Sequence, residues 1–381
     1  MRHWLGLQAI GACVLTLAAC SGATHGPTQA VSAATAAPPG AALRISGHRF
    51  VDSSGHAIRL LGVNRSGTEY ACVQGWGIFD GPSDATSITA MTSWRVNAVR
   101  VPLNEDCWLG INGVKAQYAG IAYRSAIKQY VRLLHQAGLA AILDLHWAAP
   151  GSTPATQQLP MADADHAPSF WASVADAFKT DDRVAFDLYN EPFISPSNAV
   201  TGDPWSCWLH GCAMRPGSGI SGTWRSAGMQ ALLDAVRSAG AHQPVLAGGL
   251  AWSSDLSGWA SHRPIDPQHQ VAASFHLYNF AGCSTQRCWD AQVAPVAAVA
   301  PVVTGELGED DCAGGFINGY MGWADAHGVS YLGWTWDTWP CGSGPALISS
   351  YSGTPTGFGA ALRSHLRQLA PPTFAPAGAT P

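Results

Sequence analysis

The stretch from 184 to 192 reads Val-Ala-Phe-Asp-Leu-Tyr-Asn-Glu-Pro. It begins as a short, mostly apolar run and ends on Asn190, Glu191 and Pro192. A strand that is covered on both faces reads as such a run, which is typical of a parallel sheet. A second run, at 301–306, reads Pro-Val-Val-Thr-Gly-Glu and also ends on a carboxylate, Glu306. The two stretches predict two buried strands that each carry a glutamate at the carboxyl end.

Short apolar runs of this kind recur eight times: 58–64, 97–103, 140–147, 184–192, 244–250, 271–278, 301–307 and 331–337. Most intervals show helical periodicity, as in 123–138, which ends on a glycine suited to a helix C-terminus. Strands and helices that alternate eight times over about 300 residues predict a closed (β/α)8 TIM barrel. An open doubly wound sheet is the alternative, but residues 62–67 do not match the glycine-rich phosphate turn that normally follows its first strand.

Polar residues stand at the carboxyl ends of these predicted strands. Polar groups are costly to bury there, and in a (β/α)8 barrel the strand ends converge on the catalytic face. The residues are Asn64, Arg100, His146, Asn190, Glu191, His276, Tyr278, Glu306 and Trp336. Two carboxylates at such ends indicate glycoside hydrolysis, in which one carboxylic acid protonates the leaving oxygen and the other carboxylate attacks or assists from the opposite face of the sugar.

This set of residues resembles glycoside hydrolase family 5, the cellulase-type retaining enzymes of clan A. The resemblance rests on the order Arg, His, Asn-Glu-Pro, His-x-Tyr, Glu, Trp and covers residues 43–369. It implies that Glu191, on strand four, is the acid/base and that Glu306, on strand seven, is the nucleophile. It also implies that Asn190 binds the sugar 2-hydroxyl beside the bond to be cut. The residues that would complete the site are Arg100, His146, His276, Tyr278 and Trp336.

Electrostatics gives the two carboxylates different environments in this interpretation. A general acid must stay protonated near neutral pH, so burial and a second carboxylate should raise the pKa of Glu191. Glu306 must stay ionised. Arg100 and the phenol of Tyr278 can hold it so through charge-assisted hydrogen bonds.

The remaining polar residues are interpreted as support. His146 and His276 are expected to donate hydrogen bonds rather than to shuttle protons, because the acid/base work is already assigned. Trp336 is expected to offer a flat apolar face on which a pyranose ring stacks. Asp144 and Asp187 precede the strand ends and are expected to make structural hydrogen bonds.

The cysteines favour disulfides. Eight of the ten lie beyond the first twenty residues, an even number, and the two Cys-x4-Cys spacings lie too far apart, without a regular partner histidine, to favour zinc. Each of the eight follows a strand, which places them all on the catalytic face. The predicted pairs are Cys72–Cys107, Cys312–Cys341, Cys207–Cys212 and Cys283–Cys288.

Loops on the same face carry many tryptophans. They are Trp76, Trp108, Trp205, Trp208, Trp289 and Trp339. Exposed aromatics on a rigid rim form sugar-binding subsites, although some of these must pack the loops instead. The long segment 193–222 is predicted to be a wall or lid of the cleft.

The ends of the chain differ from the barrel. Residues 1–20 resemble a bacterial lipoprotein signal, with an apolar stretch after Arg2 and a Leu-Ala-Ala-Cys ending whose Cys20 would be lipidated after cleavage; ordinary secretion is the alternative. Residues 21–42 are expected to be a flexible linker and 370–381 a disordered tail, because both lack large apolar side chains. Between linker and barrel, 43–58 predicts a β-hairpin that opens a catalytic domain of residues 43–369.

The bulk composition excludes some partners. A net charge of −5, with 12% charged residues and no run of like charges, lacks the electrostatic footprint of a nucleic-acid binder. We therefore expect an exported retaining hydrolase of β-linked oligo- or polysaccharides, either a cell-envelope lipoprotein anchored through Cys20 or a secreted enzyme. It should act as a monomer and need no cofactor and no metal.

The favoured substrate is a β-1,4-glucan, cut by endo action as in cellulases. The alternatives on the same scaffold are an exo-acting β-glycosidase and a β-mannanase. A metal-dependent barrel hydrolase is more distant, because such barrels usually place paired histidines after strand one and Leu61-Gly-Val-Asn64 has none. A non-catalytic glycan-binding protein is equally distant, because the pair of glutamates is intact.

Overall fold

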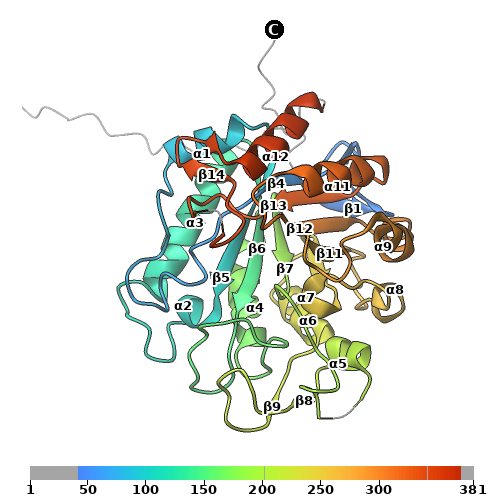
Figure 1. The fold of residues 1–381 in the computed structure, drawn as a ribbon. Helices are drawn as coiled ribbons and strands as arrows, with labels where there is room; N and C mark the ends of the chain where they lie inside the picture. The colour runs from blue at the N-terminus through green and yellow to red at the C-terminus, as the bar shows by residue number, and fades with distance from the viewer. Residues whose placement is uncertain (1–41, 201, 341, 370–381) are drawn as a thin grey trace, which may run out of the picture. The chain divides into compact units, whose positions relative to one another are not determined.

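Eight parallel strands close into a barrel in the computed structural model, which describes residues 42–369 apart from 201 and 341 (Figure 1). The predicted (β/α)8 architecture is confirmed. In sheet order the strands are β4 (Leu61–Asn64), β5 (Ala98–Asn104), β6 (Ala140–Trp147), β7 (Val184–Asp187), β10 (Val245–Gly248), β11 (Val271–Tyr278), β12 (Val302–Gly308) and β13 (Ser330–Gly333), and β13 pairs with β4. Each overlaps one of the eight predicted runs.

Helices follow the strands and surround the barrel (Figure 1). Those that cover its outside are α1 (Ala85–Thr92), α3 (Ile121–Gln136), α4 (Ala167–Phe178), α6 (Met229–Ser238), α8 (Trp259–His262), α10 (Ala294–Ala297), α11 (Gly315–Ala326) and α12 (Gly357–Gln368). In α3 the buried residues recur at helical spacing, for example Tyr123, Ile127 and Leu134. Gly138, with φ of 80°, ends this helix in the left-handed conformation, as predicted.

Shorter elements lie between the strand ends and these helices. The helical ones are α2 (Glu105–Leu109), α5 (Pro204–His210), α7 (Leu250–Ser253), α9 (Gln286–Cys288) and the π-helical turn Trp289–Val293. The extended ones are β8 (Ala213–Met214), β9 (Trp224–Arg225), β14 (Ile348–Ser350) and β15 (Thr354–Pro355). The predicted wall segment 193–222 contains α5 and β8, which lie with β9 at the lower edge of Figure 1.

A three-stranded sheet precedes the barrel and closes its N-terminal end. It consists of β1 (Arg44–Ser46), β2 (Arg49–Val51) and β3 (Ala57–Ile58). The turn predicted at 52–55 joins β2 to β3, with the Asp52 carboxylate accepting from Ser54 N and His56 N. The predicted hairpin is therefore present, with one more strand than expected because a second turn at Gly47 divides the first strand. Phe50 and Ile58 pack in one cluster with the lower barrel residues, such as Ile142 and Leu246.

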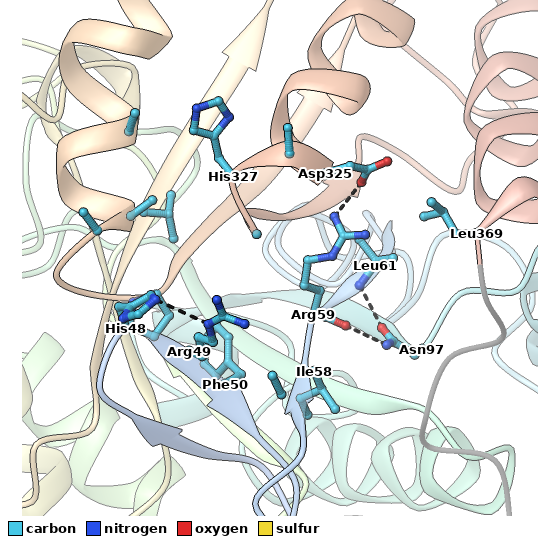
Figure 2. Close-up of a pocket in the computed structure, with 18 of the residues that line it drawn as sticks. His48, Arg49, Phe50, Ile58, Arg59, Leu61, Asn97, Asp325, His327 and Leu369 are labelled. Carbon is cyan, nitrogen blue, oxygen red and sulfur yellow. Dashed lines mark hydrogen bonds and ion pairs between the residues drawn. The ribbon is translucent and has the colours of Figure 1, made fainter.

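A cavity of about 680 Å³ lies at the same N-terminal end, between the hairpin sheet and helices α10, α11 and α12 (Figure 2). Arg59 crosses it, with its Nη1 2.5 Å from Asp325 Oδ1 and its carbonyl oxygen accepting from Asn97 Nδ2 at 2.7 Å. This end holds the first residues of the strands, such as Leu61, whereas Glu306 lies at the other end of β12. In barrels of this kind the N-terminal end serves stability, so this cavity lies away from the catalytic face.

Three of the four predicted disulfides are present: Cys72–Cys107, Cys207–Cys212 and Cys283–Cys288. The fourth pair, Cys312–Cys341, stays a prediction because Cys341 lies outside the described residues. Cys72 and Cys107 join the loops after β4 and β5, which are neighbouring strands. The disulfides therefore tie down the segments that follow the strands, on the catalytic face.

Several predictions for the chain ends fall on residues that the structure does not describe. They concern the signal segment 1–20 with Cys20, nearly all of the linker 21–42 and the tail 370–381. Among the described residues, none of the helices is both long enough and apolar enough to cross a bilayer.

Candidate active site

The inside of the barrel changes from apolar to ionic along the strands. At the N-terminal end, inward-facing side chains include Ala98, Ile142, Ala185 and Ala272. Side chains alternate along a strand, so the residue two positions on faces the same way. In the same four strands those next residues are Arg100, Asp144, Asp187 and Ser274, all fully buried. A layer of charge therefore rests on an apolar layer, in the middle of the barrel.

Arg100 is the only cation of this layer within the described structure, and three carboxylates meet it. Its Nε donates to Asp187 Oδ2 at 2.9 Å, its Nη2 lies 3.0 Å from Asp144 Oδ1, and its Nη1 donates to Glu306 Oε1 at 3.0 Å. Its guanidinium also donates to the amide oxygens of two asparagines, Asn190 (2.8 Å) and Asn64 (3.1 Å). Burial alone would lower the pKa of Arg100, but the three carboxylates raise it above its ordinary value.

Asp144 and Asp187 make the hydrogen bonds and ion pairs expected of structural carboxylates, but with catalytic partners. Burial raises the pKa of each to about 7, against the opposing effect of Arg100. Asp144 also forms a hydrogen bond with His146, whose Nδ1 lies 2.7 Å from Asp144 Oδ2. These two aspartates therefore orient the groups that line the site.

A β-bulge turns Glu306 into the barrel. Along β12 and β11, Thr304 pairs with Phe275 but Glu306 pairs with His276, so Gly305 is an extra residue. Thr304 bonds to Tyr320 of α11, on the outside of the barrel. Without the bulge Glu306, two positions on, would face the helices as well. An added Cβ at Gly305 would stand only 3.0 Å from His276 Nε2, so glycine fits the close approach of the two strands.

Glu306 is held by two donors from opposite directions. Arg100 binds Oε1, and the Tyr278 hydroxyl donates to Oε2 at 2.5 Å. Burial raises the pKa of Glu306, whereas Arg100 and then Tyr278 are among the groups that lower it. The pKa of Glu306 stays above its ordinary value, and these two partners oppose the rise that burial causes.

Glu191 follows β7 and faces Glu306 across His276. His276 Nδ1 lies 2.9 Å from Glu191 Oε1 and 3.6 Å from Glu306 Oε2. Oxygen atoms of the two glutamates and a ring nitrogen of His276 all lie within 4.8 Å of one another. Burial first, and then the carboxylate of Glu306, raise the pKa of Glu191 well above its ordinary value. The pKa of Glu306 is raised too, but that of Glu191 is raised further, so Glu191 is the member of the pair better suited to hold a proton.

Two neutral histidines complete the polar wall. Burial lowers the pKa of His146 to about 3 and that of His276 well below its ordinary value. Asn190, predicted to bind a sugar hydroxyl, accepts from Arg100 and donates from Nδ2 to Gln158 Oε1 at 3.0 Å. The same Nδ2 lies 3.3 Å from His146 Nε2. The neutral histidines are suited to hydrogen bonding and carry no charge beside Glu191.

The prediction for Trp336 is wrong. Its side chain is fully buried and meets Trp94 edge-on, with 4.9 Å between the ring centres, so it offers no face to a sugar. β13 ends at Gly333, earlier than the predicted run, because the chain then bonds to neighbouring loops: Thr335 N donates to Pro345 O. Trp336 thereby turns away from the barrel axis.

Trp334 takes the place that was predicted for Trp336. It is partly exposed, precedes a cis peptide bond to Thr335, and stacks on His146 at 5.4 Å with an interplanar angle of 11°. It is the first aromatic residue after β13. A shorter assignment of the eighth strand would have found it from the sequence.

The rim tryptophans divide into two groups. Trp108 and Trp208 are fully buried and Trp289 nearly so, which makes them loop-packing residues. Trp76 is 47% exposed, and Trp205 and Trp339 are partly exposed. Two further exposed aromatics were not predicted: Trp252, which is 55% exposed and stacks flat on Phe193 at 4.8 Å, and Phe280, which is 64% exposed. Nothing in their local sequence marks these two as exposed.

Gln158 was also missed by sequence reasoning. It lies in the loop between β6 and α4, accepts from Asn190 and donates from Nε2 to the backbone oxygen of Glu191 at 3.2 Å. Since an isolated glutamine in a long loop carries no sequence signal, only the folded loop identifies it.

Comparisons with known proteins agree with this geometry. The model of the cellulase family, glycosyl hydrolase family 5, matches residues 51–339. A mannan endo-1,4-β-mannosidase of Streptomyces lividans is 24% identical over 320 residues, which are 80% of this chain and 68% of that protein.

Solved structures of similar fold include both glucanases and mannanases. A β-glucanase of Saccharophagus degradans, also solved in complex with cellotetraose, has a TM-score of 0.66 at 20% identity over 90% of this chain and 97% of its own. A mannanase of Streptomyces sp. SirexAA-E has a TM-score of 0.54 at 20% identity over 85% and 90%. With the family model covering most of the barrel, this chain belongs to glycoside hydrolase family 5 and is a β-glycoside hydrolase.

Proposed function

We propose that the protein is an exported endo-β-1,4-glucanase that works with retention of configuration. One observation carries the stereochemistry: carboxyl oxygens of Glu191 and Glu306 lie within 4.8 Å of each other. Retaining glycosidases place their two carboxyl groups about 5–5.5 Å apart, whereas inverting enzymes need about 6.5–9.5 Å to admit a water molecule. The separation favours double displacement.

In the first step, Glu306 attacks the anomeric carbon while Glu191 gives its proton to the leaving glycosidic oxygen. The C–O bond to the leaving sugar breaks as the C–O bond to Glu306 forms. In the second step, ionised Glu191 takes a proton from water, the water oxygen attacks the anomeric carbon, and Glu306 leaves. The raised pKa of Glu191 supports the first role, and the donors on Glu306 support its ionised starting state.

A chain of sugars, rather than a single ring, fits the surface beside Glu191. Phe193 and Trp205, from the segment that follows the Asn-Glu-Pro motif, and Trp252, from α7, line a cavity of about 570 Å³. Trp252 N donates to Pro192 O at 2.9 Å, which holds this wall next to the acid. Flat aromatic faces bind pyranose rings, and this is the side from which the leaving group departs.

The backbone around Trp252 supports a binding role. Ala251, Trp252 and Ser253 all have positive φ, at 53°, 57° and 56°. Three consecutive non-glycine residues in the left-handed region are costly, and such strain collects at functional sites. We infer that this strained turn presents Trp252 to the leaving sugar.

A β-mannanase is the second candidate. The curated relative from Streptomyces lividans is named for action on mannan, whereas the structure with the higher TM-score is a β-glucanase. The sugar units of the two substrates differ in configuration at C2, and Asn190 is the residue proposed to bind the hydroxyl group on that carbon.

The three disulfides support folding in an oxidising compartment, in keeping with the proposed export as a lipoprotein or secreted monomer.

Product analysis tests the proposed function. On a panel of β-1,4-glucan, β-1,3-glucan, xylan and β-mannan, we expect the highest kcat/KM on β-1,4-glucan, with a mixture of internal fragments. NMR should detect the β-anomer of the new reducing end first. An α-anomer detected first would contradict retention, and a preference for mannan would establish the second candidate.

Glu191→Gln and Glu306→Gln separate the two carboxylate roles. Loss of the acid should lower kcat on polymer by about 10²–10⁴-fold and much less on an aryl glycoside whose phenolate leaves without a proton. Loss of Glu306 should abolish turnover of both substrates. An unchanged turnover in Glu191→Gln would favour a non-catalytic role for this residue.

The wild-type enzyme should stay active after chelation of metal ions, measured at a temperature at which the chelated enzyme is folded.

Tyr278→Phe tests how Glu306 is kept ionised. The Tyr278 hydroxyl lowers the pKa of Glu306, so its removal should raise that pKa and move the acid limb of the kcat/KM profile to higher pH. The lost charge-assisted bond should lower kcat/KM about tenfold or more. Tyr331→Phe is the matched control, since Tyr331 donates to a carboxylate, Asp325, at the other end of the barrel. An acid limb that stays in place in Tyr278→Phe would contradict this role.

Trp334→Ala and Trp336→Ala test the corrected assignment. Loss of Trp334 should lower kcat/KM about tenfold with little change in melting temperature, because the ring is only partly buried. Loss of Trp336 should cost about 3–5 kcal/mol of folding stability, while kcat/KM measured well below the melting temperature stays close to wild type. The reverse pattern would restore Trp336 as the sugar platform.

Trp252→Ala tests the wall on the leaving-group side. It should raise KM for a glucan polymer about tenfold and leave kcat/KM for an aryl glycoside unchanged, because the aryl group does not reach a second sugar subsite. Trp76→Ala, which removes another exposed tryptophan of the rim, serves as the comparison. Equal losses on both substrates would argue against a subsite at Trp252.

A further inference from the structure

A second cluster of titratable side chains lies on the same face of the barrel, apart from the catalytic glutamates. Glu105 begins α2 directly after β5, and Asp163 and His166 lie just before α4. One ligand atom from each of the three lies within 4.8 Å of the other two. We propose that Glu105, Asp163 and His166 form a binding site for a divalent transition-metal ion, of the Zn²⁺ or Mn²⁺ class.

Both carboxyl groups are buried, and only one of the two oxygens of each accepts a hydrogen bond from the backbone. Glu105 and Asp163 are both 0% exposed. One oxygen of each accepts a backbone N–H: Glu105 Oε1 from Ala149 N at 3.3 Å, and Asp163 Oδ1 from His166 N at 2.7 Å. The other oxygens, Glu105 Oε2 and Asp163 Oδ2, have no hydrogen-bond donor among the described residues. Buried polar atoms are rarely left so, and a cation would complete them.

No arginine or lysine compensates the two charges. Within the described structure, the ion pairs of Glu105 and Asp163 are with His166 alone, whose Nδ1 lies 3.8 Å from Glu105 Oε1 and 3.9 Å from Asp163 Oδ1. Burial, and then the neighbouring Asp163, raise the pKa of Glu105 well above its ordinary value, so without an ion the two carboxyl groups share a proton, which a cation would displace. The backbone bonds to Ala149 and His166 fix the carboxylates in place, as outer hydrogen bonds do around metal ligands.

The donor set selects the class of ion. An imidazole nitrogen with two carboxylates suits Zn²⁺ or Mn²⁺, whereas Ca²⁺ and Mg²⁺ prefer oxygen ligands throughout. His166 Nδ1 lies 3.5 Å from the carbonyl oxygen of Ala149, a long contact that the ring nitrogen gives up when it ligates an ion. The side chain of His166 is 26% exposed, which gives an ion a route from solvent.

A bound ion would join three segments of the catalytic face. Glu105 is the first residue of α2, which follows β5, and Asp163 and His166 lie in the loop after β6. Asp163 also forms a β-bridge with Ser226 beside β9. The loop after β6 is the one that carries Gln158, which bonds to Asn190. The ion would therefore act on the stability of this loop and take no part in the glycosidic chemistry.

Metal titration of the full chain tests the proposal. The enzyme is stripped with a chelator, the chelator is removed, and Zn²⁺, Mn²⁺ or Ca²⁺ is added alone. We expect one equivalent of Zn²⁺ or Mn²⁺ to bind by calorimetry and elemental analysis, and a saturating excess to raise the melting temperature by about 5 °C. Ca²⁺ at the same concentration should have little effect.

Variants locate the ion. Glu105→Gln and Asp163→Asn keep the acceptor oxygens for the backbone and should abolish both binding and the rise in melting temperature. Both should also melt close to the temperature of the chelated wild type, since the new amide can donate the hydrogen bond that the shared proton makes between the two carboxyl groups. His166→Gln, at a partly exposed position, should weaken binding at least tenfold. If the other two variants do not fold, His166→Gln alone tests whether the ion binds at this cluster.

Asp310→Asn is the control, because Asp310 lies in the other acidic loop of this face and bonds to Asn279. It should bind metal as the wild type does. The proposal is overturned if the wild type binds no ion, if Ca²⁺ stabilises it as well as Zn²⁺ and Mn²⁺ do, or if the cluster variants bind metal as tightly as the Asp310→Asn control. It does not depend on the substrate of the enzyme.

Discussion

The buried guanidinium of Arg100 is the interaction on which the catalytic end of the barrel depends. It is one cation among three carboxylates, Asp144, Asp187 and Glu306, with bonds to two asparagines besides. Removing one member of such a buried network leaves uncompensated charge and costs about 3–5 kcal/mol. The geometry of Arg100 therefore fixes Glu306 and the polar groups around it at once, and it opposes the rise that burial causes in the pKa of both glutamates.

The barrel makes this arrangement by simple alternation, with one exception. In β5, β6, β7 and β11 an inward-facing residue packs in the apolar layer, and the next inward-facing residue, two positions later, is polar. These polar residues are Arg100, Asp144, Asp187 and Ser274. β12 breaks the alternation at Gly305. The bulge reverses the facing of the strand, so Glu306 enters the barrel although Thr304, two residues earlier, faces α11. Bulges re-aim side chains next to active sites in this way.

Much of the site was predictable because its residues share one rule. Strand runs end on polar residues, and the ends of parallel strands meet on one face, so Arg100, His146, Glu191, His276 and Tyr278 could be placed together from the sequence. Trp336 could not be placed, because hydrogen bonds between distant loops, such as Thr335 to Pro345, end β13 early and put Trp334 in the site instead. Gln158 and Trp252 come from loops whose course depends on tertiary contacts rather than on local periodicity.

The sequence by itself determined the number and order of the strands, the family, the two glutamates and three of the disulfides, because these follow from hydrophobic periodicity and from which strands are neighbours. The tertiary structure alone decided the direction of Glu306, the separation of the two carboxyl groups, and the meeting of Glu105 with Asp163 and His166. These features depend on distances across the barrel and between loops. A pattern of residues along the chain records which side chains face inward, but it does not record how far apart two of them come to lie.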